Sequence, residues 1–248
     1  MRNLHLFHEL SQILRALQAA NIPVIVLKGA CLAATVYDNI ALRPMGDVDL
    51  LVMQDDLTQT LALMGSLGYA SPHSFDPNAV RAFHHHMPPL TKDGSVTVEI
   101  HWTIACPHHP IHFAAADLAQ IWTRAQPIAI GDSSGLKLSP TDLLLHLCEH
   151  ASVHHRFDGA GLRNYVDIAM VHQHYGDSID WEQFTSRARQ WGVANGVHLA
   201  LQLAEEWTNF ACPASVLTAL DAAPLDAATG QWVRHKILNG SSPALRKS

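Results

Sequence analysis

Residues 43–52 read RPMGDVDLLV, and the apolar, β-branched run at the end of this segment predicts a strand over 47–52. Asp47 and Asp49 are two positions apart, so both carboxylates face one side of that strand while Val48 and Leu50 face the core. Two neighbouring carboxylates repel each other, and a hard divalent cation with oxygen ligands relieves that repulsion. Gly46 allows a close approach of the chain before the strand. By itself, such a pair would also suit a turn residue followed by a solvated strand residue.

A second segment of interest precedes this pair. Residues 22–29, IPVIVLKG, predict a buried strand that ends in glycine, and a short helix is expected over 30–37. The backbone N–H groups and the dipole at such a helix start favour phosphate. Lys28 adds a positive charge there, and Gly29 would hold the phosphates, although an ordinary strand-to-helix turn is the alternative.

A third carboxylate lies in VTVEIHW, residues 96–102, within a strand expected over 95–104. The apolar side chains of this strand share one face, whereas Glu99 and His101 share the other. A carboxylate in the centre of so apolar a strand is costly unless it has a partner. Glu99 is therefore a candidate third metal ligand, and an edge strand with a solvated face is the alternative.

Residues 82–91 predict a partner strand, joined to the third strand through the turn signal Asp93-Gly94. Two adjacent prolines restrict this partner to an edge or irregular strand. Counting back from the turn places His86 opposite His101 and puts His84 on the same face. These histidines would contact a triphosphate, accept a proton from an acceptor hydroxyl, or only line a polar pocket.

Composition narrows the class of protein. The 248 residues, about half of them apolar and 15% charged, suit a globular protein that needs no disulfides. The four cysteines lie far apart and suggest free thiols in a reducing compartment. The chain has neither a membrane-length apolar run nor a signal-peptide pattern, so a cytoplasmic location is expected. The formal charge of −6 weighs against a nucleic-acid partner.

The periodicity changes along the chain and predicts an α/β (α+β) protein in two parts. Residues 1–135 form the predicted α/β module with a mixed sheet, and 136–248 form a helical module that begins near Ser139-Pro140. No strand is expected in the second part. The helices expected there span 140–156, 161–174, 180–191, 195–208, 213–221 and 226–238.

The helical module carries part of an unusual total of eighteen histidines. His146, His150 and His154 recur every four residues and predict one stripe along a helix. Glu149 lies off that stripe, so the pattern lacks the glutamate of a zinc-protease helix, and a polar seam is favoured over a zinc site. The roles of His150 and Asp167 are left open.

These segments together resemble the DNA polymerase beta-like nucleotidyltransferase superfamily. More narrowly, they resemble the bacterial family of uncharacterised nucleotidyltransferases known as nucleotidyltransferase family 5, over roughly residues 10–210. The resemblance rests on LKGACLAATVYDN, LRPMGDVDLLV, VEIHW, LLHLCEHASVHH and LRNYVDIAMV.

The resemblance implies Mg²⁺ or Mn²⁺ at a catalytic trio and transfer of a nucleoside monophosphate from a nucleoside triphosphate, such as ATP, to a hydroxyl or similar acceptor. The acceptor would be a small molecule, a peptide or a protein. The implied catalytic and metal-binding residues are Asp47, Asp49 and Glu99. The candidate nucleotide-binding residues are Lys28, Gly29, Arg43, Gly46, His86 and His101.

The sequence also departs from the superfamily pattern. It has Lys28-Gly29-Ala30 where a serine hydroxyl often contacts a phosphate, so Lys28 would take over that role. Arg43 is a phosphate contact or a structural ion pair. Three other functions remain open: a non-catalytic or antitoxin-like nucleotide-binding module, a toxin-like enzyme that modifies RNA or protein, and a histidine-metal hydrolase.

Overall fold

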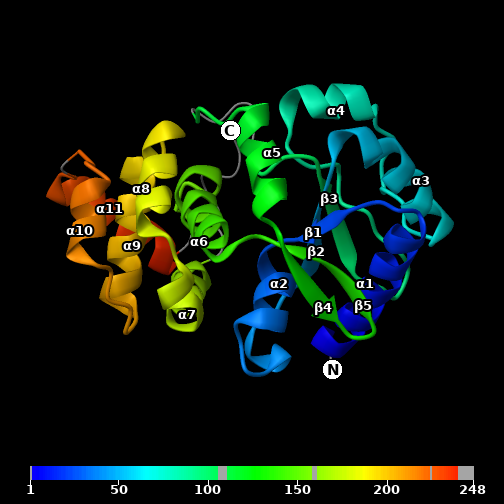
Figure 1. Ribbon diagram of the computed structural model, residues 1–248, viewed down its shortest axis with the longest axis horizontal. Coiled ribbons are helices and arrows are strands. Elements are labelled where there is room, and N and C mark those ends of the chain that lie inside the picture. Colours follow the sequence, from blue (N-terminus) through cyan, green and yellow to red (C-terminus); the bar gives the residue numbers. More distant parts are fainter. Residues whose placement is uncertain (1, 106–110, 158–160, 224, 240–248) are drawn as a thin grey trace. The chain divides into compact units, whose positions relative to one another are not determined.

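The computed structural model describes residues 2–105, 111–157, 161–223 and 225–239 (Figure 1). The chain forms two compact units. One comprises Met1–His108 with Ala114–Ser139, and the other comprises His109–Phe113 with Pro140–Ser248. The first unit contains a sheet with helices, and the regular elements described in the second unit are all helices.

The sheet of the first unit has five strands in the order β3-β2-β1-β5-β4. Strands β2 and β3 are parallel, as are β1 and β5, whereas β1–β2 and β4–β5 are antiparallel. The sheet is thus mixed, which confirms the predicted α+β class. The strands are β1 (Val24–Val26), β2 (Asp47–Val52), β3 (Thr97–His101), β4 (Gln126–Ile130) and β5 (Ser133–Lys137).

Helices complete this unit. Helix α2, expected over 30–37, starts at Lys28 rather than after Gly29. Asn21, two residues after the end of α1, adopts the left-handed conformation that often follows the end of a helix. The helices are α1 (Arg2–Ala19), α2 (Lys28–Thr35), α3 (Leu57–Ser66), α4 (Pro77–Phe83) and α5 (Ala115–Arg124), with 3-10 turns at Ile40–Leu42 and Gln54–Asp56.

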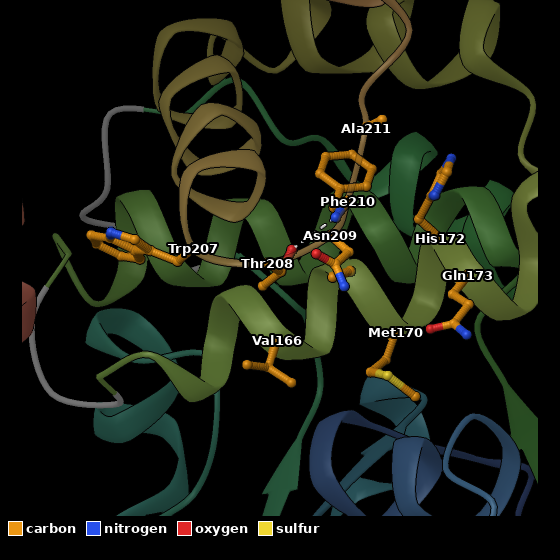
Figure 2. Close-up of a pocket in the computed structure, with 10 residues that line it drawn as sticks. Val166, Met170, His172, Gln173, Trp207, Thr208, Asn209, Phe210 and Ala211 are labelled. Carbon is orange, nitrogen blue, oxygen red and sulfur yellow. Dashed lines mark hydrogen bonds between the residues drawn. The ribbon is translucent and has the colours of Figure 1, made fainter.

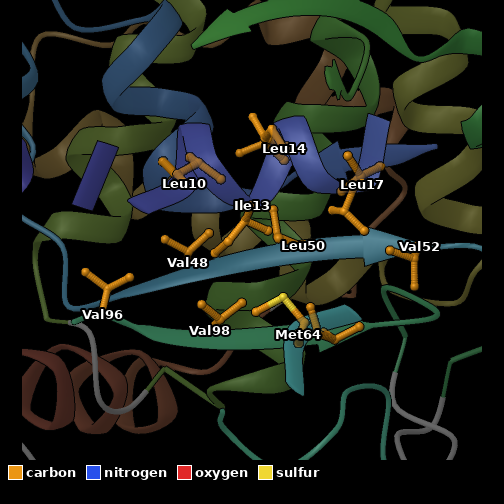
Figure 3. Close-up of a cluster of buried hydrophobic side chains, with 14 of the residues drawn as sticks. Leu10, Ile13, Leu14, Leu17, Val48, Leu50, Val52, Met64, Val96 and Val98 are labelled. Carbon is orange, nitrogen blue, oxygen red and sulfur yellow. The ribbon is translucent and has the colours of Figure 1, made fainter. Parts of the chain in front are cut away.

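The core lies between α1 and the sheet. The apolar side chains of α1 recur at helical spacing, and Leu10, Ile13 and Leu14 belong to the same buried cluster as Val48 and Leu50 of β2. Figure 3 shows Ile13 facing the two β2 side chains. All five are almost completely buried. Because side chains alternate along a strand, burial of Val48 and Leu50 on this face leaves the aspartates of β2 on the opposite one.

Two segments differ from their predictions. Residues 82 and 83, expected at the start of the strand over 82–91, instead end a helix over 77–83 that Asp76 caps and that has Pro77 in its first turn. The following residues pair with β3 only through isolated antiparallel bridges, one of which joins His86 to His101 as predicted. Strand β5 was not predicted, because it is rich in serine and glycine. Its Gly135 packs closely against β1, since a Cβ there would lie 3.5 Å from the carbonyl oxygen of Val24.

In the helical unit, all six predicted helices are present, although the first ends early in a π-helical turn at His150–His154. Arg187 of α8 donates to Asp142 of α6 over 2.8 Å. No helix in the described part of the chain is long and apolar enough to span a membrane. The helices are α6 (Pro140–Glu149), α7 (Arg163–Tyr175), α8 (Trp181–Gln190), α9 (Ala194–Trp207), α10 (Ala214–Ala219) and α11 (Ala227–Asn239).

Candidate active site

The register of β2 and β3 places the candidate carboxylates side by side. Asp49 lies directly opposite Glu99 across the parallel pair, and Asp47 lies opposite Thr97. His101 follows two residues after Glu99 and therefore shares its face. One face of two neighbouring strands thus carries three acidic groups and an imidazole.

Asp49 is the most constrained of these groups. Its Oδ1 accepts hydrogen bonds from Lys28 Nζ and from His101 Nε2, both at 2.9 Å, and its side chain is almost fully buried. Burial by itself would raise the pKa of Asp49, but the Lys28 charge and the two hydrogen bonds outweigh it and hold this pKa far below the ordinary value. Asp49 is therefore a fixed anion at neutral pH.

Glu99 has the opposite electrostatic environment. Its Oε2 lies 3.8 Å from His101 Nε2 and 3.9 Å from His86 Nδ1. Burial, and then repulsion by Asp49 and Asp47, raise the pKa of Glu99 to about 7. The pKa values of the neighbouring carboxylates Asp49 and Glu99 thus differ widely, and Glu99 can take up or release a proton near neutral pH.

The imidazoles beside Glu99 are neutral. Burial lowers the pKa of His101 to about 4, and since Asp49 is ionised, His101 Nε2 is the donor of their hydrogen bond. Burial also lowers the pKa of His86, whose Nδ1 lies 2.8 Å from the Met87 carbonyl oxygen and donates to it. The ring centroids of His86 and His101 lie 5.0 Å apart.

The two histidines before His86 differ from the sequence prediction. His84, which the counted register puts on the face of Glu99, is exposed at the end of α4. His85 is buried, with its ring 5.3 Å from that of His101 and 4.6 Å from that of His86. Strict strand alternation would exclude His85, so only the irregular backbone before the prolines brings it in.

The start of α2 supplies the positive charge of the site. Lys28 is the first residue of α2, and its φ of 42° is a left-handed conformation that costs energy for a residue with a side chain. The conformation accompanies the short contact between its Nζ and Asp49. Backbone strain is thus concentrated where the ammonium enters the carboxylate cluster.

Gly29 and Arg43 pack against each other. A Cβ at Gly29 would lie 3.2 Å from Arg43 Nη1 and 3.3 Å from Met45 Cβ, so only glycine fits without a shift of these side chains. Arg43 is buried and donates from Nη1 to the Pro44 carbonyl oxygen over 3.0 Å. At Gly46 the nearest atom to a Cβ would be Arg2 Nη2 at 3.4 Å, so the predicted need for a close approach is weak there.

The residues present fit a divalent cation. Asp49, Glu99 and His101 each offer a ligand atom, and these atoms lie within 4.8 Å of one another. Asp47, exposed at the start of β2, acts electrostatically on Glu99 and is two residues from Asp49 on the strand. The hard carboxylate oxygens suit Mg²⁺ or Mn²⁺. His101 is already engaged as a donor to Asp49, which makes it an orienting group for that ligand.

A cavity of about 810 Å³ lies in the helical unit, between α7 and the segment that follows α9. Met170, Trp207 and Phe210 contribute apolar surface, and His172, Gln173 and Asn209 contribute polar groups (Figure 2). The Phe210 backbone N–H donates to Thr208 Oγ1 over 3.0 Å and shapes one wall. The cavity contains none of the candidate catalytic residues.

A family model described as "Uncharacterised nucleotidyltransferase" matches residues 1–209, and the chain belongs to this family. This confirms the relationship predicted from the motifs. No curated protein sequence matches the chain significantly.

Several solved structures are similar in fold. The antibiotic-resistance factor ANT(2'')-Ia is 14% identical, with a TM-score of 0.49 over 75% of this chain and 94% of that one. An antigenic nucleotidyltransferase-like protein from Paracoccidioides brasiliensis is 17% identical, with a TM-score of 0.49 over 92% and 97%. The lincosamide antibiotic adenylyltransferase LnuA, bound to lincomycin, is 14% identical, with a TM-score of 0.43 over 66% and 94%.

Proposed function

We propose that this protein transfers a nucleoside monophosphate from a nucleoside triphosphate to a hydroxyl or similar group, using Mg²⁺ held by Asp47, Asp49 and Glu99. The observation that carries the proposal is the register of β2 and β3, which sets Asp49 directly beside Glu99 on one face of the sheet. Carboxylates in such an arrangement are suited to divalent ions that neutralise phosphate charge and orient the attacking oxygen.

The chain's own residues have separable roles in this proposal. His101 donates to Asp49 and holds its carboxylate in place, so Asp49 presents its remaining oxygen surface to the cation. Lys28 brings a positive charge to the same carboxylate and lies at the start of α2, where a triphosphate would be stabilised by both the ammonium and the helix dipole.

Glu99 is the proposed proton acceptor or third ligand. A pKa of about 7 means that this carboxyl exchanges its proton at neutral pH, which suits a group that either receives the acceptor's proton or loses its own when a cation binds. His86 Nδ1 lies 3.9 Å from Glu99 Oε2 but donates to the Met87 carbonyl oxygen, so His86 is a polar neighbour of Glu99 and not its proton acceptor.

The proposed acceptor is a small molecule or a peptide. The formal net charge of −6 weighs against a nucleic-acid acceptor, because a polyanion would require a basic surface to release counterions. The carboxylate cluster itself does not discriminate among hydroxyl acceptors, so the nucleotide is the part of the reaction to identify first.

Calorimetric titration of the full chain with ATP, GTP, CTP and UTP, each with Mg²⁺, tests this function. We expect one triphosphate to bind only with metal, and Asp47→Asn/Asp49→Asn to abolish that binding. Asp55→Asn/Asp56→Asn removes the same charge from a short turn after β2 and serves as the matched control.

Circular dichroism and thermal unfolding establish that both double variants fold. Equal binding by wild-type and Asp47→Asn/Asp49→Asn protein would refute the metal assignment, and a wild type that binds no triphosphate would refute the activity. Once the nucleotide is known, pyrophosphate release in the presence of candidate hydroxyl compounds and peptides identifies the acceptor.

A further inference from the structure

The turn that follows α6 brings together histidines that an α-helix would separate. The N–H of His155 donates to the His150 carbonyl oxygen over 2.9 Å, which is the five-residue spacing of a π-helix. In an α-helix, position i+5 lies about 140° around the axis from position i, so His155 would face away from His150. The wider turn returns His155 to the same side as His150 and His154.

The three rings are in mutual contact. The ring centroids of His150 and His155 lie 4.3 Å apart, those of His150 and His154 lie 4.9 Å apart, and those of His154 and His155 lie 5.1 Å apart. Each residue offers a ring nitrogen, and the three nitrogens lie within 4.8 Å of one another. All three side chains are half-buried, so they are reachable from solvent yet partly enclosed.

The backbone holds this arrangement. Phe157 N–H donates to the Ala151 carbonyl oxygen over 2.9 Å, and Lys236 Nζ of α11 donates to the Arg156 carbonyl oxygen over 3.2 Å. Arg156 and Phe157 have positive φ angles of 48° and 59°, a costly conformation for two successive residues with side chains. Strain of this kind is often kept at functional sites, and a π-turn frequently marks one.

We propose that His150, His154 and His155 bind one transition-metal dication, with Zn²⁺ the best-suited ion and solvent completing its coordination. Three neutral imidazoles are ligands for Zn²⁺, Cu²⁺ and Ni²⁺ rather than for Mg²⁺. Tetrahedral Zn²⁺ with bonds of about 2.0–2.1 Å needs ligand nitrogens about 3.3 Å apart. Rotation about the side-chain torsions would bring the three ring nitrogens to that spacing without a change in the backbone turn.

The site differs from the histidine stripe expected from the sequence. That stripe consists of His146, His150 and His154, and the rings of its first two members are 5.8 Å apart. His146 is 2% exposed, whereas the proposed set replaces it with the more accessible His155. The site also lies in a different unit from Asp49 and Glu99 and involves softer ligands than these carboxylates.

The test uses untagged full-length Asp47→Asn/Asp49→Asn protein, so that the carboxylate pair does not compete for the ion. After dialysis against EDTA, Zn²⁺ is titrated calorimetrically with a competing chelator. We expect one tight ion per chain, with affinity reduced at least about tenfold by His154→Gln and by His155→Gln, since even outer-shell losses at metal sites cost 10–100-fold. His174→Gln, an exposed histidine of α7, is the matched control and should bind as its parent does.

X-ray absorption of the zinc-loaded parent should give three imidazole nitrogens. His155→Gln distinguishes the π-turn set from the helical stripe, because it leaves the stripe intact. Undiminished zinc affinity in His155→Gln protein would overturn the proposal. So would weak binding of several ions that His174→Gln reduces equally, because that is adventitious binding to surface histidines. Circular dichroism of each variant verifies that the fold is retained.

Discussion

At the scale of single residues, the site depends on neighbouring carboxylates whose pKa values are shifted in opposite directions. Asp49 stays ionised because it accepts bonds from Lys28 and His101, whereas Glu99 has a pKa of about 7 because burial and the adjacent anions disfavour its charge. A pair of this kind can bind a cation and exchange a proton at the same pH. Its electrostatics give two direct tests.

The first test is the pH dependence of Glu99→Gln. A carboxyl with a raised pKa binds more protons in the folded state than in the unfolded state between its model value of 4.5 and about 7, so stability falls as pH rises through that window. Removing the ionisable group removes the penalty. In EDTA, we expect Glu99→Gln protein to match wild type near pH 4.5 and to be more stable by about 1–3 kcal/mol at pH 8.

Urea unfolding at both pH values measures this difference. The amide of the variant can still donate to Asp49, as the protonated carboxyl does, so loss of that hydrogen bond would not obscure the result. If Glu99→Gln changed stability by the same amount at both pH values, the pKa of Glu99 would not be raised.

The second test is Lys28→Met. The variant removes the ammonium from the buried Asp49 carboxylate and leaves the hydrogen bond from His101 in place, and removing one partner of a buried ion pair is costly. We expect a loss of about 2–4 kcal/mol in unfolding free energy without metal. Mg²⁺ should recover part of this loss, because the cation then supplies the missing positive charge.

Lys92→Met is the matched control for that variant. Lys92 Nζ lies 3.2 Å from Glu9 Oε2, but Lys92 is more exposed than Lys28, and Glu9 also accepts from Tyr69 and Ser95. Such a pair contributes about 1 kcal/mol or less. Thermal unfolding with EDTA or Mg²⁺ compares the two variants, and an equal effect of Mg²⁺ on both would argue against a cation site beside Asp49.

At the scale of secondary-structure elements, the position of α2 determines where the positive charge enters. Strand β1 ends at Val26, and α2 begins only two residues later, so the helix start lies directly beside β2. The Leu27 N–H donates to the Asp49 carbonyl oxygen over 3.0 Å and ties this junction to the strand that carries the aspartates. Close packing around Gly29 therefore controls the geometry of the site.

Gly29→Val tests this packing. The new side chain would collide with Arg43 Nη1 and Met45, which are already 3.2 and 3.3 Å from an ideal Cβ. Overpacking of this kind costs about 1–3 kcal/mol, and movement of Lys28 should weaken Mg²⁺-triphosphate binding at the same time. Gly46→Val is the control, because its nearest neighbour is the end of a flexible arginine side chain.

Urea unfolding and triphosphate titration measure both effects. We expect Gly46→Val protein to lose less stability than Gly29→Val protein. Comparable losses in the two variants would mean that the contact with Arg43 and Met45 does not restrict position 29.

At the scale of the whole molecule, the chain divides into a mixed-sheet unit and a helical unit. Each contains its own histidine cluster, and the two clusters have different chemistry. The imidazoles of the first lie beside carboxylates, which suits hard cations, whereas those of the second lie beside one another, which suits softer ones. A chain with eighteen histidines thus concentrates several of them at two separate points.

Much of this organisation was readable from local pattern. Period-two alternation in DVDLLV and VTVEIHW predicted that Asp49 and Glu99 would each lie on the polar face of a strand, because side-chain direction in a strand follows from backbone geometry alone. The helical unit was predictable for a similar reason, since its apolar positions recur at helical spacing. The Asp-Gly turn was sufficient to place His86 opposite His101.

Tertiary structure alone determined the rest. The register of β2 with β3, the bond from Lys28 to Asp49 and the opposite pKa shifts depend on groups far apart in sequence, so no local pattern contains them. The entry of His85 into the site follows from irregular backbone beside prolines, and the joining of His155 to His150 follows from a π-turn. Local sequence specifies the direction of a side chain on a regular element, whereas packing and long-range hydrogen bonds decide where the backbone departs from regularity and which distant groups meet.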